Sequence, residues 1–344
     1  MGSLRMLLLV ALSIVHLLDL GAALVSDAEW AAYKSKYNKK YTLEDANHRG
    51  LYEKKVVLVR NHNLKYEKGQ EDYFMKLNEF SDTDQKVLYT YRSTIPPPTD
   101  PDNDLDARSD IPKNYTRYDD IKGGIDWRDH GYISPVGNQG TECLSCWAFA
   151  SSGVLEAHLA IKAGRLVTLS QKHLVDCVPA PNNGCYGGWV SVAFNYTRDH
   201  GIAPMESYPS YQPKTDTCRY IPTKSRKGAE SYYTLKLGDE KELAEVVYNI
   251  GPVAISINHL YQEFEEYGGG VLNIKNCTTE RIRLTHSMLL VGFGTDPIRG
   301  DYWLIKNSQG TSWGEEGYLR LARNAGNMCG VASLAQYPVI KNEK

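Results

Sequence analysis

The chain has 344 residues, of which 42% are hydrophobic and 23% are charged, and its formal net charge is −2. A chain of this length can bury one large core or two smaller ones. The nearly balanced charge and the lack of a basic stripe in the sequence argue against nucleic acid as a partner.

The first residues have the features of a secretory signal peptide. Arg5 precedes an apolar run from Met6 to Leu20, and small residues follow at 21–23. The run is short for a membrane span and contains Asp19, which disfavours an anchor. We therefore expect residues 1–23 to be a signal peptide. The protein would then enter the secretory pathway for a lysosome or the extracellular space, and would not stay in the membrane once the signal is removed.

Residues 24–94 are expected to form a helical domain of their own. The stretch "ANHRGLYEKKVVLVRNHNLKYEKG" carries apolar residues at helical spacing, so we expect two helices followed by a short strand in "DYFMKLNEF". Residues 95–110, "IPPPTDPDNDLDARSD", contain three consecutive prolines and five aspartates. Such a segment cannot pack into a core and is expected to be an exposed linker that a protease can cut.

Residues 111–344 have a different pattern. A helical pattern covers 146–162, and short alternating runs follow in "VAISI", "SMLLVGFG", "DYWLIKNS" and "GYLRLAR". A helical half followed by a β half predicts an α+β fold. The sequence has no internal repeats.

All seven cysteines lie in this second region, and their number is odd, so at least one cannot pair within the chain. The leftover thiol is either incidental or functional. Three Asn-x-Thr sequons are expected glycosylation sites in a secreted protein, at Asn114, Asn195 and Asn276.

The stretch "GNQGTECLSCWAFASSG" at 137–153 contains Cys143-x-x-Cys146. A structural zinc site needs a second pair of ligands, which the sequence does not offer, so we expect neither a metal nor another cofactor. The alternative is a nucleophile, because Cys146 begins a predicted helix, whose N-terminus stabilises a thiolate. A nucleophile also needs a base and a group to orient that base. His286 at a strand start and Asn307 just after the next strand are candidates.

Taken in order, these motifs resemble the papain/cathepsin L family of cysteine peptidases. The motifs are "NQG…C..SCWAF", "LVDCV", "NNGCYGGW", "THSMLLVGFG" and "YWLIKNS.G..WGEEGY". The resemblance implies a papain-like two-domain fold over 111–344, with a helical left domain, a β-barrel-like right domain and the active-site cleft between them. It also implies a nucleophile at Cys146, a base and acid at His286 that pairs with it as an ion pair, and an orienting residue at Asn307. Gln139, with the backbone N–H of Cys146, would form the oxyanion hole.

The resemblance has further implications for disulfides and specificity. It pairs Cys143 with Cys185, Cys177 with Cys218, and Cys277 with Cys329, and so leaves Cys146 free. It places substrate-binding positions at Gly187, Gly188, Trp189, Val190, Ser256, Leu284 and Leu334. These positions imply a preference for apolar P2 residues such as Val or Leu. The sequence has no long cysteine-rich insertion of the kind that gives cathepsin B its exopeptidase activity, so we expect endopeptidase activity.

The N-terminal region resembles the inhibitory propeptide of the family. The family's spaced Glu, Arg, Phe, Asn, Ile and Asn correspond here to Glu44, His48, Tyr52, Lys55, Val59 and Asn63. We expect this region to lie through the cleft as an intramolecular inhibitor, and we hypothesise that its acidic groups lose charge in acid and loosen it. The expected partners are protein and peptide substrates, this propeptide and cystatin-like inhibitors, and the enzyme is expected to be a monomer.

Three departures from the family pattern surround the site. The loop between Gln139 and Cys146 is one residue longer, Leu144 replaces a glycine, and Gln309 replaces a tryptophan. We expect Leu144 to add bulk and exclude glycine-only backbone angles, and Gln309 to leave the hydrogen bond between Asn307 and His286 wetter and weaker. The alternative function is therefore a catalytically weak or inactive homologue that binds peptides or proteins.

Overall fold

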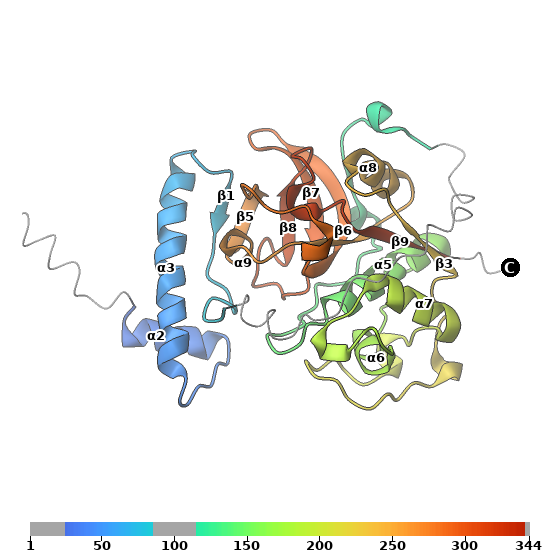
Figure 1. Ribbon diagram of the computed structural model, residues 1–344, viewed down its shortest axis with the longest axis horizontal. Helices are drawn as coiled ribbons and strands as arrows, with labels where there is room; N and C mark the ends of the chain where they lie inside the picture. Colours follow the sequence, from blue (N-terminus) through green and yellow to red (C-terminus); the bar gives the residue numbers. More distant parts are fainter. Residues whose placement is uncertain (1–24, 85–114, 341–344) are drawn as a thin grey trace, which may run out of the picture.

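The computed structural model describes residues 25–84 and 115–340. The predicted signal peptide, the linker at 95–110 and the sequon at Asn114 lie outside these ranges. The described chain has three parts: an N-terminal helical segment, a half built of helices and a half built of strands (Figure 1). None of the helices in the described ranges is both long and apolar enough to span a bilayer.

The N-terminal segment contains two helices and a strand, as predicted: α2 (Asp27–Lys36), α3 (Asp45–Glu67) and β1 (Tyr73–Met75). Ser26 caps α2, since its side chain accepts from the backbone N–H of Glu29 while the Glu29 carboxylate accepts from the Ser26 backbone. The two helices share a small aromatic core, in which the rings of Trp30 and Tyr33 stack 5.5 Å apart. The segment therefore folds around its own core beside the main body.

The helical half consists of α5 (Cys146–Ala163), α6 (Gln171–Cys177) and α7 (Val190–His200). The central helix α5 is buried along most of its length, which agrees with its apolar and small side chains. It ends at Gly164, whose φ of +69° is left-handed and suits glycine. This helix packs on both α7 and the long strand β6 (His286–Asp296), so its first residue lies where the two halves meet.

The β half holds most of the sheet and a second core. Its other strands are β2 (Ile125–Asp126), β3 (Ser231–Thr234), β4 (Val253–Ile257), β5 (Tyr267–Leu272), β7 (Gly300–Lys306), β8 (Tyr318–Ala322) and β9 (Ala335–Val339), and its helices are α8 (Glu240–Asn249) and α9 (Gln262–Glu265). The strand order is β1-β5-β8-β7-β6-β4-β9-β3, and β2 pairs with β6. Short 3-10 turns cover Tyr118–Asp120, Trp127–His130, Gly184–Tyr186, Met205–Ser207, Pro222–Lys224, Arg281–Arg283 and Met328–Gly330. All four strands predicted from alternating sequence are present.

The first strand of this sheet belongs to the N-terminal segment. Strand β1 pairs antiparallel with β5, where Tyr73 lies opposite Gly270 (Figure 1). A Cβ on Gly270 would lie 2.5 Å from the carbonyl oxygen of Asp72, and a Cβ on Gly268 would lie 2.7 Å from the ring of Phe74. The glycines of β5 therefore let the N-terminal strand come closer than any residue with a side chain would allow.

Candidate active site

Cys146, His286 and Asn307 meet where the helical half contacts the β half. Cys146 is the first residue of α5, His286 the first of β6, and Asn307 directly follows β7. The backbone N–H of Ser287 hydrogen-bonds the Cys146 thiol, so the sulfur lies beside the residue that follows His286. Strands β6 and β7 are paired neighbours, which brings Asn307 next to His286. The structure therefore assembles three residues that are far apart in sequence.

The side chain of Asn307 has a defined orientation. Its Oδ1 lies 2.8 Å from His286 Nε2 and also accepts from the backbone N–H of Ser308 at 2.8 Å. Its Nδ2 donates to Gln309 Oε1 at 3.1 Å. Gln309 is only 5% exposed and Asn307 only 3%. The expectation that Gln309 would leave this hydrogen bond wet is therefore wrong, because the glutamine is buried and is itself a partner of Asn307.

Burial governs the titration of the two reactive groups in this propeptide-bearing chain. It raises the pKa of the Cys146 thiol to about 11, although the backbone N–H groups of Ser287, Trp147 and Cys146 act in the opposite direction. Burial also lowers the pKa of His286 to about 4, against the raising effect of the Asn307 hydrogen bond. At neutral pH both groups are uncharged here, whereas the resemblance implies an ion pair.

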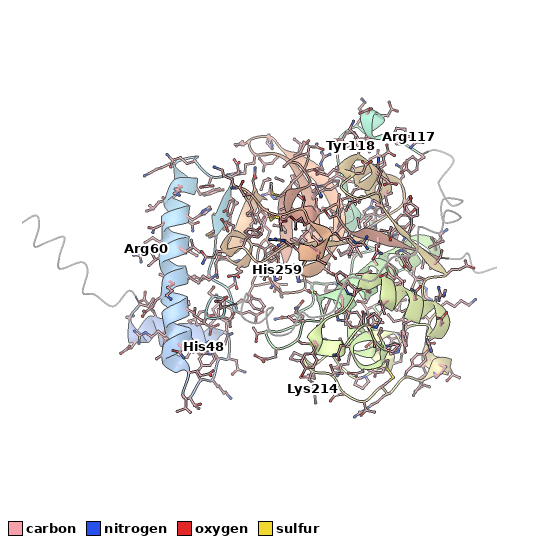
Figure 2. All side chains as sticks on the ribbon, in the orientation of Figure 1. His48, Arg60, Arg117, Tyr118, Lys214 and His259 are labelled. Atoms are coloured by element: carbon pink, nitrogen blue, oxygen red, sulfur yellow. A yellow bond between two sulfur atoms is a disulfide. The ribbon has the colours of Figure 1, made fainter. Side chains whose placement is uncertain are left out.

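A second histidine lies against the first. The ring centroids of His259 and His286 are 4.7 Å apart, and His259 lies in the interior of the body (Figure 2). Burial, and then repulsion from His286, hold the pKa of His259 well below its usual value. His259 Nδ1 lies 2.8 Å from the hydroxyl of Thr285. The base candidate thus has an uncharged aromatic neighbour.

Gln139 is held beside the nucleophile by two opposite contacts. The hydroxyl of Ser308 donates to its Oε1 at 2.7 Å, and its Nε2 donates to the carbonyl oxygen of Cys143 at 3.2 Å. The backbone N–H of Gln139 donates to the carbonyl of Ser308 at 2.8 Å. The amide group therefore points its N–H side toward the loop that carries Cys146.

The loop between Gln139 and Cys146 accommodates Leu144 without a left-handed backbone conformation. Leu144 is 3% exposed and does not have a positive φ, and its N–H donates to the carbonyl of Cys185 at 2.9 Å. The Tyr211 hydroxyl lies 2.6 Å from Ser145 Oγ and donates to the carbonyl of Gln139 at 2.9 Å. A glycine-only conformation at Leu144 is thus ruled out, and Tyr211 ties the two ends of the loop together.

The expected substrate-binding positions fall into two groups on either side of Cys146. From the helical side, Gly187 to Val190 lead into α7 and are tied to the nucleophile loop by the Cys143–Cys185 disulfide. From the β side, Ser256 donates its N–H to the carbonyl of Leu334 at 3.0 Å, and its hydroxyl lies 3.0 Å from that of Ser287. Leu284 and Leu334 are both buried. Because Ser287 satisfies the Ser256 hydroxyl, that wall is less polar than its sequence suggests.

The three disulfides are those that the resemblance implies, Cys143–Cys185, Cys177–Cys218 and Cys277–Cys329. Among the described residues Cys146 is the one cysteine without a disulfide partner. Asn276 is exposed and Asn195 is partly exposed, so both sequons lie on the surface, and their modification stays a prediction.

The N-terminal segment is bound to the body by a buried cluster of charges. Lys55 of α3 forms ion pairs with Glu265 of α9 and, at 3.3 Å, with Glu266. The hydroxyl of Ser81 donates to Glu266 at 2.6 Å, and Asn78 Nδ2 donates to the carbonyl of Glu265 at 2.9 Å. Burial raises the pKa of Glu266 to about 7, with Lys55 opposing.

Glu266 belongs to the body, so it lies outside the hypothesis that the propeptide's own acidic groups lose charge in acid. A carboxyl whose pKa is raised in the folded proenzyme contributes to the stability of the fold below its ordinary pKa, and that contribution is lost as pH rises through 7. Asp45, bonded to Lys34, and Glu29, bonded to Ser26, have lowered pKa values. They stabilise the folded N-terminal segment above their ordinary pKa values and cease to do so as pH falls. Loosening in acid stays a prediction, and these two groups are the ones whose pKa shifts have the sign that it needs.

Several residues at the site were not found by sequence reasoning. Tyr211 lies 66 positions from Ser145, and His259 lies well before the base, so no local pattern marks either. Ser308 directly follows Asn307 in the sequence, and this proximity could have indicated that it belongs to the site. Gln309 was noted as a departure, but its hydrogen bond to Asn307 requires the fold.

The chain matches two family models. The model described as "Papain family cysteine protease" covers residues 121–339. The model described as "Cathepsin propeptide inhibitor domain" covers residues 30–86.

Curated proteins and solved structures agree with these matches. The chain is 37% identical over 323 residues to "Cathepsin R" of Mus musculus, covering 91% of this chain and 92% of that protein. It is 38% identical over 322 residues to "Cathepsin L-like" of Caenorhabditis elegans, covering 91% of each. The structure of digestive procathepsin L 3 of Tenebrio molitor larval midgut superposes with a TM-score of 0.79 at 34% identity, covering 91% of this chain and 98% of that one.

Proposed function

Because the chain belongs to the papain family of cysteine proteases, we propose that Cys146 is its nucleophile, His286 its general base and acid, and Asn307 the residue that orients His286. The chain is a cysteine endopeptidase with a papain-like fold and an N-terminal propeptide inhibitor domain, that is, a zymogen. The comparisons give no support to the alternative of an inactive binding protein.

The contacts at the site support these roles. The hydrogen bond from His286 to Asn307 keeps a proton on Nε2, so Nδ1 is the nitrogen that can exchange a proton with Cys146. The sulfur then attacks the carbonyl carbon of the scissile bond, and His286 returns the proton to the leaving amine. Water, activated by the same imidazole, hydrolyses the resulting thioester and frees the enzyme.

Gln139 is proposed as the oxyanion donor together with the backbone N–H of Cys146. Ser308 fixes the amide so that Nε2 faces the nucleophile loop, and one of its two hydrogens donates to Cys143. The second hydrogen is available to the negative oxygen of the tetrahedral intermediate. Removing one such donor typically costs about 2.7–4 kcal/mol of transition-state stabilisation.

Removal of the propeptide is proposed to create the ion pair. In the zymogen, burial keeps Cys146 and His286 neutral. Access of water to the cleft lowers the cost of charging both groups, and the dipole of α5 then favours the thiolate. The propeptide thus suppresses the charged state as well as binding beside the site.

The remaining expectations extend this proposal. We propose a signal peptide at 1–23, a propeptide at 24–94, an activation linker at 95–110 and a peptidase domain at 111–344, with delivery to a lysosome or the extracellular space. The substrates are proteins and peptides, and we propose inhibition by cystatin-like proteins and a monomeric enzyme. The apolar Leu284 and Leu334, with Ser256 satisfied by Ser287, support a preference for Val or Leu at P2 over a basic residue.

The observation that carries the proposal is the bond of 2.8 Å between His286 and Asn307 directly beside Cys146. The test uses acid-processed protein and a peptidyl epoxide, with mass spectrometry to locate the label. We expect fast labelling of Cys146, and a loss of roughly 10⁴-fold or more in peptide hydrolysis on His286→Ala. His200→Ala, which changes an exposed histidine of α7, is the matched control. Unlabelled Cys146 in folded, propeptide-free wild type would refute the proposed roles.

A further inference from the structure

The side chain of Gln309 lies behind the proposed Asn307–His286 pair and completes a chain of hydrogen bonds. Gln309 Oε1 accepts from Asn307 Nδ2 at 3.1 Å, and Asn307 Oδ1 lies 2.8 Å from His286 Nε2. All three side chains are nearly inaccessible to solvent. Since buried polar contacts are strong and their loss is costly, this chain can control the position of the base.

The orientation of the Asn307 amide does not rest on the histidine alone. The backbone N–H of Ser308 remains a donor whether or not His286 is protonated, and it donates to Asn307 Oδ1. Rotation of the amide by 180° would place Nδ2 against that N–H and Oδ1 against Gln309 Oε1. The flipped state therefore loses two hydrogen bonds and gains two repulsive contacts.

The backbone around Gln309 is also fixed. Gln309 bridges to Asn138 in an isolated antiparallel pair, and the N–H of Gly310 donates to the carbonyl of Gly137 at 3.0 Å. The segment that carries Gln309 is thereby tied to the strand-like segment that carries Gln139. Gln309 thus has a fixed backbone from which to hold Asn307.

We propose that Gln309 is a positioning residue that locks the Asn307 amide with Oδ1 toward His286 and so keeps the proton on Nε2 of that histidine. This inference rests on the proposed roles of Cys146, His286 and Asn307. Gln309 touches neither the sulfur nor the imidazole and acts through Asn307. In this chain a hydrogen bond takes the place of the cover that the family's tryptophan supplies at this position.

The groups that surround His286 decide which ionisations appear in the pH dependence of activity. Its titratable neighbours are Cys146 from α5 and His259 from the segment before α9, whereas Asn307 and Gln309 carry no charge. A carboxylate at position 309 would place a negative charge directly behind Asn307. It would favour the imidazolium and move the alkaline limb of activity to higher pH.

The experiment compares acid-processed wild type with Gln309→Leu, Gln309→Glu and the control Gln336→Leu. Gln336 is a buried glutamine of β9 whose Nε2 donates to the hydroxyl of Thr234, so its loss removes one buried hydrogen bond that involves none of Cys146, His286 and Asn307. The readouts are kcat/KM per titrated active site and the pH dependence of Cys146 alkylation.

We expect Gln309→Leu to lower kcat/KM about tenfold, as for the loss of one buried hydrogen bond that holds the base, and Gln336→Leu to leave it within about twofold. Gln309→Glu keeps an acceptor oxygen and should retain activity within about threefold, with its alkaline limb raised by about one pH unit.

Two results would overturn the proposal. One is a Gln309→Leu enzyme that matches wild type. The other is equal loss in Gln309→Leu and Gln309→Glu with unchanged pH profiles, which would mean that position 309 only fills space. If Gln309→Leu does not fold, the pH shift of Gln309→Glu still decides. Failure of the proposed catalytic roles is a separate outcome, because wild-type Cys146 would then resist labelling in the same assay.

Discussion

The region around Cys146 where the helical half meets the β half, here called the seam, and the interface between the propeptide and the body are built in different ways. At the seam, each of Cys146, Asn307 and Gln139 is held by hydrogen bonds with specific partners. At the propeptide interface, a strand pairing and a buried ion cluster act together, and the propeptide has an aromatic core of its own. Hydrogen bonds at the seam demand particular residue types, whereas an interface that relies on area and several kinds of contact permits substitution. The difference accounts for the retention of Cys146, His286, Asn307 and Gln139 at the seam, while most positions of the propeptide pattern have diverged.

Lys55 illustrates the divergence. It replaces the family's asparagine in the propeptide pattern, and its partners Glu265 and Glu266 are more than two hundred residues away. A buried cation without partners would be destabilising by several kcal/mol, so the substitution is tolerated because the body supplies carboxylates. The following three predictions test whether the interface really is the tolerant region and the seam the demanding one.

The largest effect is expected for Lys55→Ala. Removing one partner of a buried ion pair leaves Glu265 and Glu266 uncompensated and costs about 3–5 kcal/mol. We expect epoxide labelling of Cys146 in the unprocessed proenzyme at pH 7 to become about 100-fold faster or more. Lys54→Ala, an exposed neighbour on α3, is the control. An unchanged labelling rate would show that the pairing of β1 with β5 suffices to hold the propeptide.

A smaller effect with a defined pH dependence is expected for Glu266→Gln. Burial raises the pKa of Glu266 to about 7, so its charged form destabilises the folded proenzyme above neutrality, and glutamine imitates the protonated form. Relative to wild type, the urea midpoint for unfolding of the proenzyme should be higher at pH 8 and nearly equal at pH 5. A difference between the two midpoints that does not vary with pH would contradict the assigned titration.

The smallest effect is expected for Tyr211→Phe at the seam. The change removes the contacts of the hydroxyl with Ser145 and Gln139, each worth about 1 kcal/mol. We expect kcat of the processed enzyme to fall about fivefold, mainly through a less rigid oxyanion loop. Tyr220→Phe, which removes a single contact with Ser225, should have no effect on kcat. Equal kcat values for the two variants would mean that the disulfide at Cys143 alone holds the loop.

The sequence predicted the parts of this molecule that depend on local pattern. The helix at 146–162, the two helices of the N-terminal segment and strands β4, β6, β7 and β8 follow from periodicity, whereas β3, β5 and β9 were not predicted. The catalytic candidates follow from motif resemblance. The orientation of Asn307 could not be predicted, because it depends on hydrogen bonds between buried side chains. The raised pKa of Glu266 could not be predicted either, since it follows from burial of the carboxyl in the folded chain. The prediction that Gln309 would weaken the hydrogen bond between Asn307 and His286 rested on its polarity alone. The structure shows instead that Gln309 is buried and bonded to Asn307.

The pairing of β1 with the glycines of β5 has a consequence for how the protein is made. Strand β5 pairs with β8 on one side and with β1 on the other, so β1 covers its outer edge. The N–H of Val271, for example, donates to the carbonyl of Asp72. Without the propeptide, a newly synthesised body would expose bare backbone donors and acceptors, flanked by residues with no side chains to obstruct another chain. Uncovered edges of this kind promote pairing between molecules and aggregation. The segment that inhibits the finished enzyme is therefore also the one that keeps the unfinished molecules apart.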